Sequence, residues 1–307
     1  MGISGRSAAL AAAVLVAAVA GGGSRAQGTQ PGVFDYDGSK PIDLRDNGRA
    51  NGAYPIAIRN VSFAVPGARV QGYLVLPPGN DRVPAVVYLH GSGGDRTQLL
   101  VPAAWLAARR AIALTVTLPS TVAGAGPKGL TPAQVLARQR RVSVADVVAT
   151  RRAVDLLRSL PRVDPRRIGL VGWSLGAKVG AVLAGAEPRI RVFALISGGA
   201  TPVSEYVARA PATLRPLVRR NLTAIDPLRW VARGRPGTIL LQDGRKDTVV
   251  PRSALLALAH AAPPRTELRW YPAGHGLNIA AYREQLDWLA RKLGIRGPVV
   301  PGAKTGP

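Results

Sequence analysis

Short, nearly uninterrupted apolar runs recur along the chain, and helical patterns separate them. Strands that are apolar on both faces and alternate with helices are typical of a parallel sheet covered by helices on both sides. The pattern therefore predicts an α/β fold whose twisted sheet is mostly parallel. The expected parallel strands lie near residues 85–89, 111–117, 167–171, 191–196, 238–242 and 267–271.

Upstream of these runs, the chain has the pattern of an antiparallel hairpin. Residues 56–65 and 69–76 are strand-like and flank the turn dipeptide Pro66-Gly67. With this hairpin, the expected sheet has about eight strands. Helices are expected to cover both faces of this sheet.

One pentapeptide, Gly172-Trp173-Ser174-Leu175-Gly176, carries the first candidate for chemistry. It directly follows the expected strand 167–171 and precedes a helical run at 177–183. A G-x-S-x-G sequence in this context is the form of a nucleophile elbow, a turn so tight that only glycine fits two residues either side of the serine. Ser174 is therefore the expected nucleophile.

A serine hydrolase of this type needs an acid and then a histidine later in the chain, each on a loop after a later strand. The loop at residues 243–251 follows the strand expected at 238–242 and contains Asp247, the expected acid. Asp243 competes for this role. Because Asp-Gly is a turn signal, its carboxylate is expected to bond local backbone N–H groups instead.

The chain contains three histidines, so elimination is informative. His275 lies in a small-residue loop after the strand at 267–271, and we expect it to be the general base. His260 ends an expected helix, where a histidine mainly satisfies carbonyl groups and the helix dipole. His90 opens a glycine-rich loop and is expected to organise that loop.

The loop His90-Gly91-Ser92-Gly93-Gly94 follows the strand at 85–89. Backbone N–H groups exposed here could stabilise a developing oxyanion, as acyl transfer requires. The expected oxyanion hole consists of the N–H groups of Leu175 and Ser92, with Gly91 as the alternative second donor. The competing interpretation is that the glycines form only a flexible turn.

In these motifs the chain resembles α/β-hydrolases of the dienelactone-hydrolase and prolyl-oligopeptidase-like serine esterase group. The matching segments occur in the family's order over roughly residues 55–293. One departure is that the chain has no cysteine, so the cysteine nucleophile of true dienelactone hydrolases is excluded. The resemblance implies serine-dependent ester hydrolysis by a Ser174-His275-Asp247 triad through an acyl-enzyme. The alternatives to an esterase are a serine peptidase or amidase of the prolyl-oligopeptidase-like type and a catalytically silent binding protein with the hydrolase fold.

The first 26 residues have the pattern of an export signal, with Arg6 before an apolar stretch at 8–20 and small residues near the end. As a helix, this stretch would reach only about 20 Å, which is short of a bilayer core of about 30 Å. We therefore expect cleavage and export, with an uncleaved anchor as the alternative. Residues 27–54 are expected to be an extended lead-in, 55–296 the catalytic domain, and 297–307 a flexible tail.

Between residues 198 and 237 the strand pattern lapses into helical segments punctuated by proline, which predicts a small cap over the site. Tyr206 and Trp230 could line a substrate pocket there, and Trp173 could do so beside the nucleophile. For each of the three, ordinary packing is the competing interpretation.

The formal charge is +24, or +22 without the first 26 residues. Such an excess attracts acidic substrates and gives weak association with anionic surfaces. A compositional bias explains the charge more simply, because the basic residues are scattered and no nucleic-acid motif is present. We expect a small-molecule ester as partner and no specific nucleic acid. The absence of cysteine and the wide spacing of the histidines predict no metal and no cofactor.

Overall fold

The computed structural model describes residues 32–50, 55–124 and 126–296 of the 307-residue chain. Contacts divide the chain into residues 1–32 and 33–307, and every element described here lies in the second unit. The expected export signal and the expected tail lie outside the described residues.

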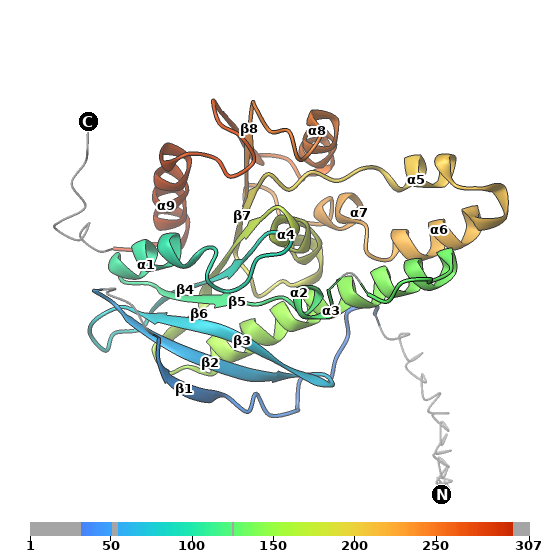
Figure 1. Cartoon of the computed structure of the whole chain (residues 1–307). Helices are drawn as coiled ribbons and strands as arrows, with labels where there is room; N and C mark the ends of the chain where they lie inside the picture. The colour runs from blue at the N-terminus through green and yellow to red at the C-terminus, as the bar shows by residue number, and fades with distance from the viewer. Residues whose placement is uncertain (1–31, 51–54, 125, 297–307) are drawn as a thin grey trace, which may run out of the picture. The chain divides into compact units, whose positions relative to one another are not determined.

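A nine-stranded sheet with the order β1-β2-β3-β5-β4-β6-β7-β8-β9 forms the centre of this unit (Figure 1). Pairing is antiparallel from β1 through β3 to β5, and parallel from β5 through β4 to β9. The mostly parallel sheet predicted from the apolar runs is therefore confirmed. The strands are β1 Arg45–Arg49, β2 Ala57–Val65, β3 Ala68–Leu76, β4 Val83–Leu89, β5 Ile112–Val116, β6 Val163–Trp173, β7 Val192–Ile196, β8 Ile239–Gly244 and β9 Glu267–Tyr271.

Strand β1 is the one that the hydrophobic pattern did not predict. It lies in the segment expected to be an extended lead-in and is composed of Arg, Asp, Asn and Gly. These residues are mostly exposed, and the pairing of β1 with β2 shifts register between Asp46 and Arg49. An exposed edge strand with no buried face has no apolar alternation, so its pairing with β2 is visible only in the structure.

Helices connect the strands and cover both faces of the sheet. The longest, α3, begins with a capping box in which Thr131 and Gln134 satisfy each other's backbone N–H groups. The helices are α1 Leu100–Ala108, α2 Pro119–Ala123, α3 Pro132–Ser159, α4 Leu175–Ala186, α5 Val203–Arg209, the 3-10 turn η1 Ala212–Leu214, α6 Arg215–Thr223, α7 Pro227–Val231, α8 Arg252–Ala261 and α9 Ile279–Leu293.

Two apolar layers, one on each face of the sheet, hold the helices in place. Val87 and Leu89 of β4 belong to the layer that α3, α4 and α8 fill, whereas Val86 and Tyr88 belong to the layer of α1 and α9. Figure 1 shows α1 and α9 beside each other on one side of the sheet. Because successive side chains of a strand point to opposite faces, a strand that is apolar throughout supplies both layers.

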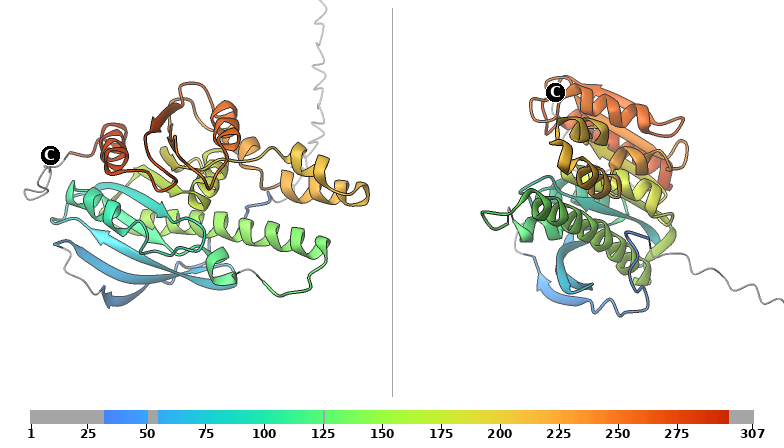
Figure 2. Two further views of the ribbon diagram at one scale, coloured as in Figure 1. Left: turned by 45° about the horizontal axis from the view of Figure 1, so that its top comes forward. Right: turned by 90° about the vertical axis from the view of Figure 1, so that its right-hand side faces the viewer.

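Helices α5 and α6 extend beyond the strands, where α6 lies beside the first turns of α3 and α5 packs against α6 (Figures 1 and 2). Val207 of α5 packs with Val218 and Leu222 of α6, and Leu136 of α3 closes this small cluster. With α7, which packs on α4, these elements occupy the region expected to form a cap. The cap therefore has an apolar contact of its own with the body of the protein.

A buried polar cluster connects the first described residues to α3 and to the end of α4. The side chain of Glu187 is 0% exposed and accepts hydrogen bonds from Arg151 at 3.2 Å and from Arg189 at 2.6 Å. Arg189 also bonds Asp155, whose carboxylate accepts from the hydroxyl of Tyr36. Burial raises the pKa of Glu187, but the hydrogen bonds from Arg189 and Arg151 outweigh burial and leave that pKa below its usual range.

Candidate active site

The residues that the sequence singled out follow the carboxyl ends of parallel strands. His90 follows β4, Ser174 follows β6, Asp247 follows β8 and His275 follows β9. From β4 the chain goes first to its neighbour β5 and later to β6 on the other side of β4, which makes a topological switch point. In open α/β sheets the crevice at such a point is where ligands bind.

Ser174 has a strained backbone, with φ 53° and ψ −106°, as the expected tight turn between β6 and α4 requires. A non-glycine residue in this region is held there by its surroundings. A Cβ at Gly172 would lie 2.3 Å from the carbonyl oxygen of Gly176, and a Cβ at Gly176 would lie 2.2 Å from that of Leu89. Both glycines are therefore needed for close backbone contacts. The N–H of Ser174 donates to the carbonyl of Ile196 at 2.8 Å, which ties the turn to β7.

Asp247 and His275 form a direct pair. Nδ1 of His275 donates to Oδ2 of Asp247 at 2.9 Å, which leaves Nε2 as the acceptor of the imidazole. The other carboxylate oxygen accepts from the backbone N–H groups of Val249 at 2.8 Å and Val250 at 3.0 Å. The side chain of Asp247 is 1% exposed, and this burial raises its pKa. The hydrogen bonds from His275 and from the backbone outweigh burial, so the pKa of Asp247 lies below its usual range.

Trp173, the residue before Ser174, joins the loop of His275 to the turn at Ser174. The indole N–H of Trp173 donates to the carbonyl of His275 at 3.0 Å, and the two ring centroids lie 5.5 Å apart. The hydroxyl of Ser197 donates to the same carbonyl at 2.9 Å. Among the described residues, the hydroxyl of Ser174 has no hydrogen-bond partner.

Two backbone N–H groups near Ser174 are free to receive an oxyanion. Leu175 is the first residue of α4, so its N–H has no acceptor within that helix. The N–H of Ser92 has no hydrogen-bond acceptor in the part of the chain that the structure describes. By contrast, the N–H of Gly91 donates to Oε1 of Gln98 at 2.8 Å. Gly91 is thus already bonded, while the two expected donors remain open.

His90 connects two loops through its buried ring. Its Nδ1 donates to the carbonyl of Gly91 at 2.7 Å, and its Nε2 accepts from the N–H of Leu118 at 2.9 Å. Accepting a backbone N–H requires an unprotonated Nε2, and burial lowers the pKa of His90 accordingly. The backbone carbonyl of His90 also accepts from the N–H of Gly176 at 3.0 Å. These contacts match the expected role of His90 in organising the loop.

His260 lies in the last turn of α8, also as expected.

Asp243, the competing acid, lies four residues before Asp247 and is 3% exposed. The imidazole of His275 donates its hydrogen bond to Asp247 and not to Asp243. Burial and the negative charge of Asp247 raise the pKa of Asp243 to about 7, and the backbone of Ser197 only partly offsets them. Two neighbouring carboxyl groups thus differ in ionisation at neutral pH because their environments differ.

A cavity of about 300 Å³ lies beside Leu175, the residue after Ser174, and is lined by residues of α3, α4 and the helices α5 to α7. Leu175 and Tyr206 are among its lining residues. Trp230, another pocket candidate, instead packs its ring against Phe34 at 5.2 Å between centroids and donates its indole N–H to Ala224. Trp173 contacts the His275 loop. Of the three aromatic candidates, Tyr206 is therefore the one that the structure places at this cavity.

Sequence reasoning missed Ser197 and Gln98. Ser197 follows β7, has a positive φ of 49° and holds the carbonyl of His275. Gln98 holds the N–H of Gly91 in the glycine-rich loop. A serine after a strand or a glutamine before a helix has no distinctive pattern, so nothing local in the sequence could have identified either contact.

Within the described ranges, no three His, Asp or Glu side chains come together in a way that could hold a metal ion. In the same part of the chain, no helix has both the length and the apolar character that crossing a bilayer requires.

Known proteins with the same fold include esterases and a peptidase. Acetyl xylan esterase 1 from Thermoanaerobacterium sp. JW/SL YS485 aligns with a TM-score of 0.66 and 17% identity, over 82% of this chain and 89% of the esterase. For the acetyl xylan esterase from Paenibacillus sp. R4 the TM-score is 0.68 and the identity 20%, over 83% and 90% of the two chains. The acylaminoacyl peptidase of Pyrococcus horikoshii aligns with a TM-score of 0.57 and 18% identity, over 78% of this chain and 42% of the peptidase.

At these identities the structural likeness shows the fold alone. No curated protein is detectably similar in sequence. The sequence model of the Alpha/beta hydrolase family, however, matches residues 86–298, which is more than half of the chain and includes every candidate residue described above. The sheet order and the Gly-Trp-Ser-Leu-Gly turn agree with this match. The chain therefore belongs to the alpha/beta hydrolase family.

Proposed function

We propose that the protein is a serine esterase that cleaves carboxylic esters through Ser174, His275 and Asp247. One observation carries this proposal: the strained Ser174 lies next to Trp173, which is hydrogen-bonded to the loop of His275, and His275 in turn is paired with Asp247. A nucleophile, a base and a group that orients the base are the requirements of covalent acyl transfer.

In the first half of the reaction, Nε2 of His275 takes the proton of the Ser174 hydroxyl as its oxygen attacks the ester carbonyl carbon. Asp247 has a lowered pKa and is therefore ionised, so it holds the Nδ1–H tautomer and stabilises the imidazolium that forms. The N–H groups of Ser92 and Leu175 receive the oxyanion, and each donor contributes about 3 kcal/mol to lowering the barrier.

In the second half, the tetrahedral intermediate collapses and His275 returns the proton to the departing alcohol. The acyl group is then bonded to Ser174. Water, activated by His275, attacks this acyl-enzyme and releases the carboxylic acid. The product pair is one acid and one alcohol, and Ser174 is regenerated.

A fluorophosphonate probe and a series of 4-nitrophenyl esters test this proposal. The wild-type protein is expected to react with the probe at Ser174 and to hydrolyse short esters, whereas Ser174→Ala loses both properties. Asp247→Asn is expected to lower kcat by about 10⁴-fold, because the wrong imidazole tautomer is then favoured. A folded wild-type protein that neither reacts with the probe nor cleaves an ester would refute the esterase and favour a silent binding protein.

Peptidases are also among the structural neighbours, so amide cleavage is the second candidate. This chain spans about two fifths of those neighbours, at 42% and 41% of their lengths. If the protein is an esterase, aminoacyl 4-nitroanilides should be poorer substrates than the 4-nitrophenyl esters of matching acyl groups, by much more than the difference in chemical reactivity between amides and esters. Comparable kcat/KM values for the two series would favour the peptidase.

A further inference from the structure

Lys178 places a cation one helical turn after the candidate nucleophile. It belongs to the first turns of α4, and its backbone N–H donates to the carbonyl of Ser174 at 3.1 Å. The side chain lines the same 300 Å³ cavity as Leu175, whose N–H is a candidate oxyanion donor. Four residues of an α-helix rise about 6 Å, so the ammonium group lies within the reach of a substrate bound at Ser174.

The ammonium group of Lys178 has no hydrogen bond and no ion pair with any residue in the described part of the chain. Two carboxylates, Asp146 and Asp226, also line the cavity, but neither forms an ion pair with Lys178. Asp146 accepts from the N–H of Ser120 at 2.8 Å, and Asp226 caps α7 by accepting from the N–H of Leu228 at 2.9 Å. Among the described residues, the ammonium group of Lys178 is therefore not in direct contact with either carboxylate and can still pair with an anion that enters the cavity.

The surroundings of this cation make an anionic ligand favourable. Lys178 as a whole residue is exposed, but the surrounding cavity walls partly desolvate its ammonium group and lower its pKa. A charge that has lost part of its water is stabilised more by a nearby opposite charge than an exposed one is. Val179 and Val182 of α4, with Leu222 of α6, form apolar walls of the same cavity. The cavity thus suits a short carbon chain that ends in a negative group.

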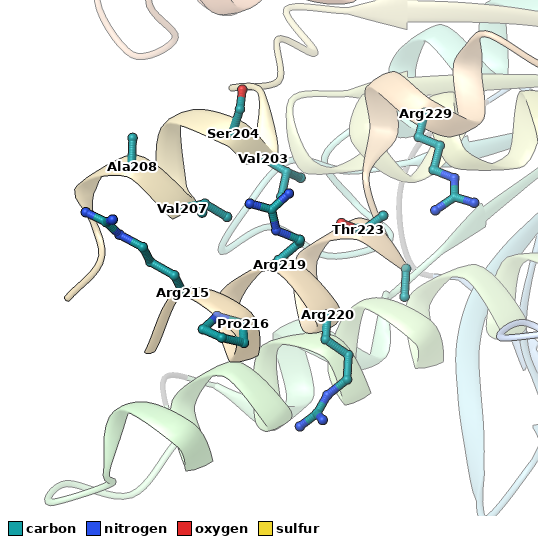
Figure 3. A pocket seen from close by; sticks show the side chains of 11 residues that line it. Val203, Ser204, Val207, Ala208, Arg215, Pro216, Arg219, Arg220, Thr223 and Arg229 are labelled. Atoms are coloured by element: carbon teal, nitrogen blue, oxygen red, sulfur yellow. The ribbon is translucent and has the colours of Figure 1, made fainter. Parts of the chain in front are cut away.

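A second, open groove is lined by residues of α5, α6 and α7 and carries further positive charge (Figure 3). It has a volume of about 1120 Å³ and shares Val203 with the Lys178 cavity. Figure 3 shows Arg215 and Arg219 extending from α6 towards α5. Arg220 and Arg229 also line the groove, and none of these four arginines forms an ion pair within the described residues. Unpaired positive charge near a site raises the encounter rate of anionic substrates.

We propose that the substrate is an ester that carries a carboxylate, which binds Lys178 while the ester carbonyl lies at Ser174. This inference rests on the proposed esterase function and narrows its substrate class. The carboxylate can belong to the acyl chain or to the alcohol. In both cases its recognition uses the same charge-assisted contact with the ammonium group.

Two pairs of esters test the charge and its position. The acyl pair is 4-nitrophenyl hemisuccinate and its neutral isostere, 4-nitrophenyl 4-methylpentanoate. The alcohol pair is 4-acetoxybenzoate and its neutral methyl ester. Within each pair the readout is the ratio of kcat/KM for the anionic ester to kcat/KM for the neutral ester, measured with one protein sample so that differences in folding cancel.

We expect this ratio to fall by about tenfold or more in Lys178→Met for at least one pair, and to be largely restored in Lys178→Arg. The fall should appear mainly in KM, and the wild-type ratio should decrease as the salt concentration rises. Lys40→Met, at a lysine that is 76% exposed and outside the cavity, is the matched control and should leave the ratio unchanged. The pair that responds identifies the position of the carboxylate.

Equal ratios in the wild type and in Lys178→Met, for both pairs, would overturn the proposal. Preference of the wild type for the neutral member of both pairs would do the same. In either case, cleavage of the neutral esters that Ser174→Ala abolishes would leave the esterase function standing. Loss of all cleavage in the wild type would instead refute the esterase itself, so the two failures are distinguishable.

Discussion

Replacement of Asp243 with Asn is expected to remove a pH-dependent loss of stability. The carboxyl is 3% exposed, and its pKa is raised from 3.8 to about 7, first by burial and then by the charge of Asp247. Between these two pKa values the unfolded chain releases the proton while the folded chain keeps it. The free energy of unfolding therefore falls as pH rises through this window and is constant above it.

The magnitude follows from the width of the window. One pKa unit corresponds to about 1.4 kcal/mol, so the full rise in the pKa of Asp243 costs the folded state about 4 kcal/mol once the carboxyl ionises. Between pH 5 and pH 8 the wild type should lose about 3 kcal/mol from this group. Asn keeps the shape of the side chain and does not titrate. Its advantage over Asp should therefore grow by about 3 kcal/mol over the same interval.

Urea unfolding followed by circular dichroism at pH 5 and pH 8 measures this difference in the full chain. Any constant cost of the amide is common to both pH values and cancels. In an Asp247→Asn background the growth should be smaller, because the charge that contributes to the raised pKa is absent. Parallel pH profiles for the wild type and Asp243→Asn would refute the reasoning, since they would mean that the carboxyl titrates equally in the folded and unfolded chains.

Two further substitutions test the packing around the site and the buried ion cluster. Gly176→Ala places a Cβ 2.2 Å from the carbonyl oxygen of Leu89, a backbone atom that cannot turn away as a side chain could. We therefore expect a loss of about 2 to 3 kcal/mol in the free energy of unfolding, together with reduced phosphonate labelling. A variant as stable and as reactive as the parent would contradict the close approach. Glu187→Gln leaves Arg151 and Arg189 without their buried partner and should cost about 3 to 5 kcal/mol in urea unfolding at pH 7. Because the pKa of Glu187 is lowered in the folded chain, this difference should shrink as pH falls below 4.5, and a gap independent of pH would argue against the ion pair.

Much of the scaffold could be predicted from local patterns. The apolar runs predicted the parallel strands because a strand buried on both faces is apolar at every position. The glycines around Ser174 identified the tight turn, since such a turn restricts residue type within five consecutive positions, and the order of serine, acid and histidine suggested the proposed chemistry. With three histidines in the chain, elimination pointed to His275.

The contacts between those motifs could not be read from the sequence. Strand β1 has no apolar face, and the bonds of Trp173 and Ser197 to the carbonyl of His275 join residues 102 and 78 positions apart. Whether Lys178 has a counter-ion, and whether Gly91 or Ser92 keeps a free N–H, depends on side chains that fold in from other elements. Local sequence determines which residues can bend, pair or react, because backbone conformation and burial act over a few neighbouring positions. Which of them meet, and in what electrostatic surroundings, is decided only when the sheet brings distant loops to one edge.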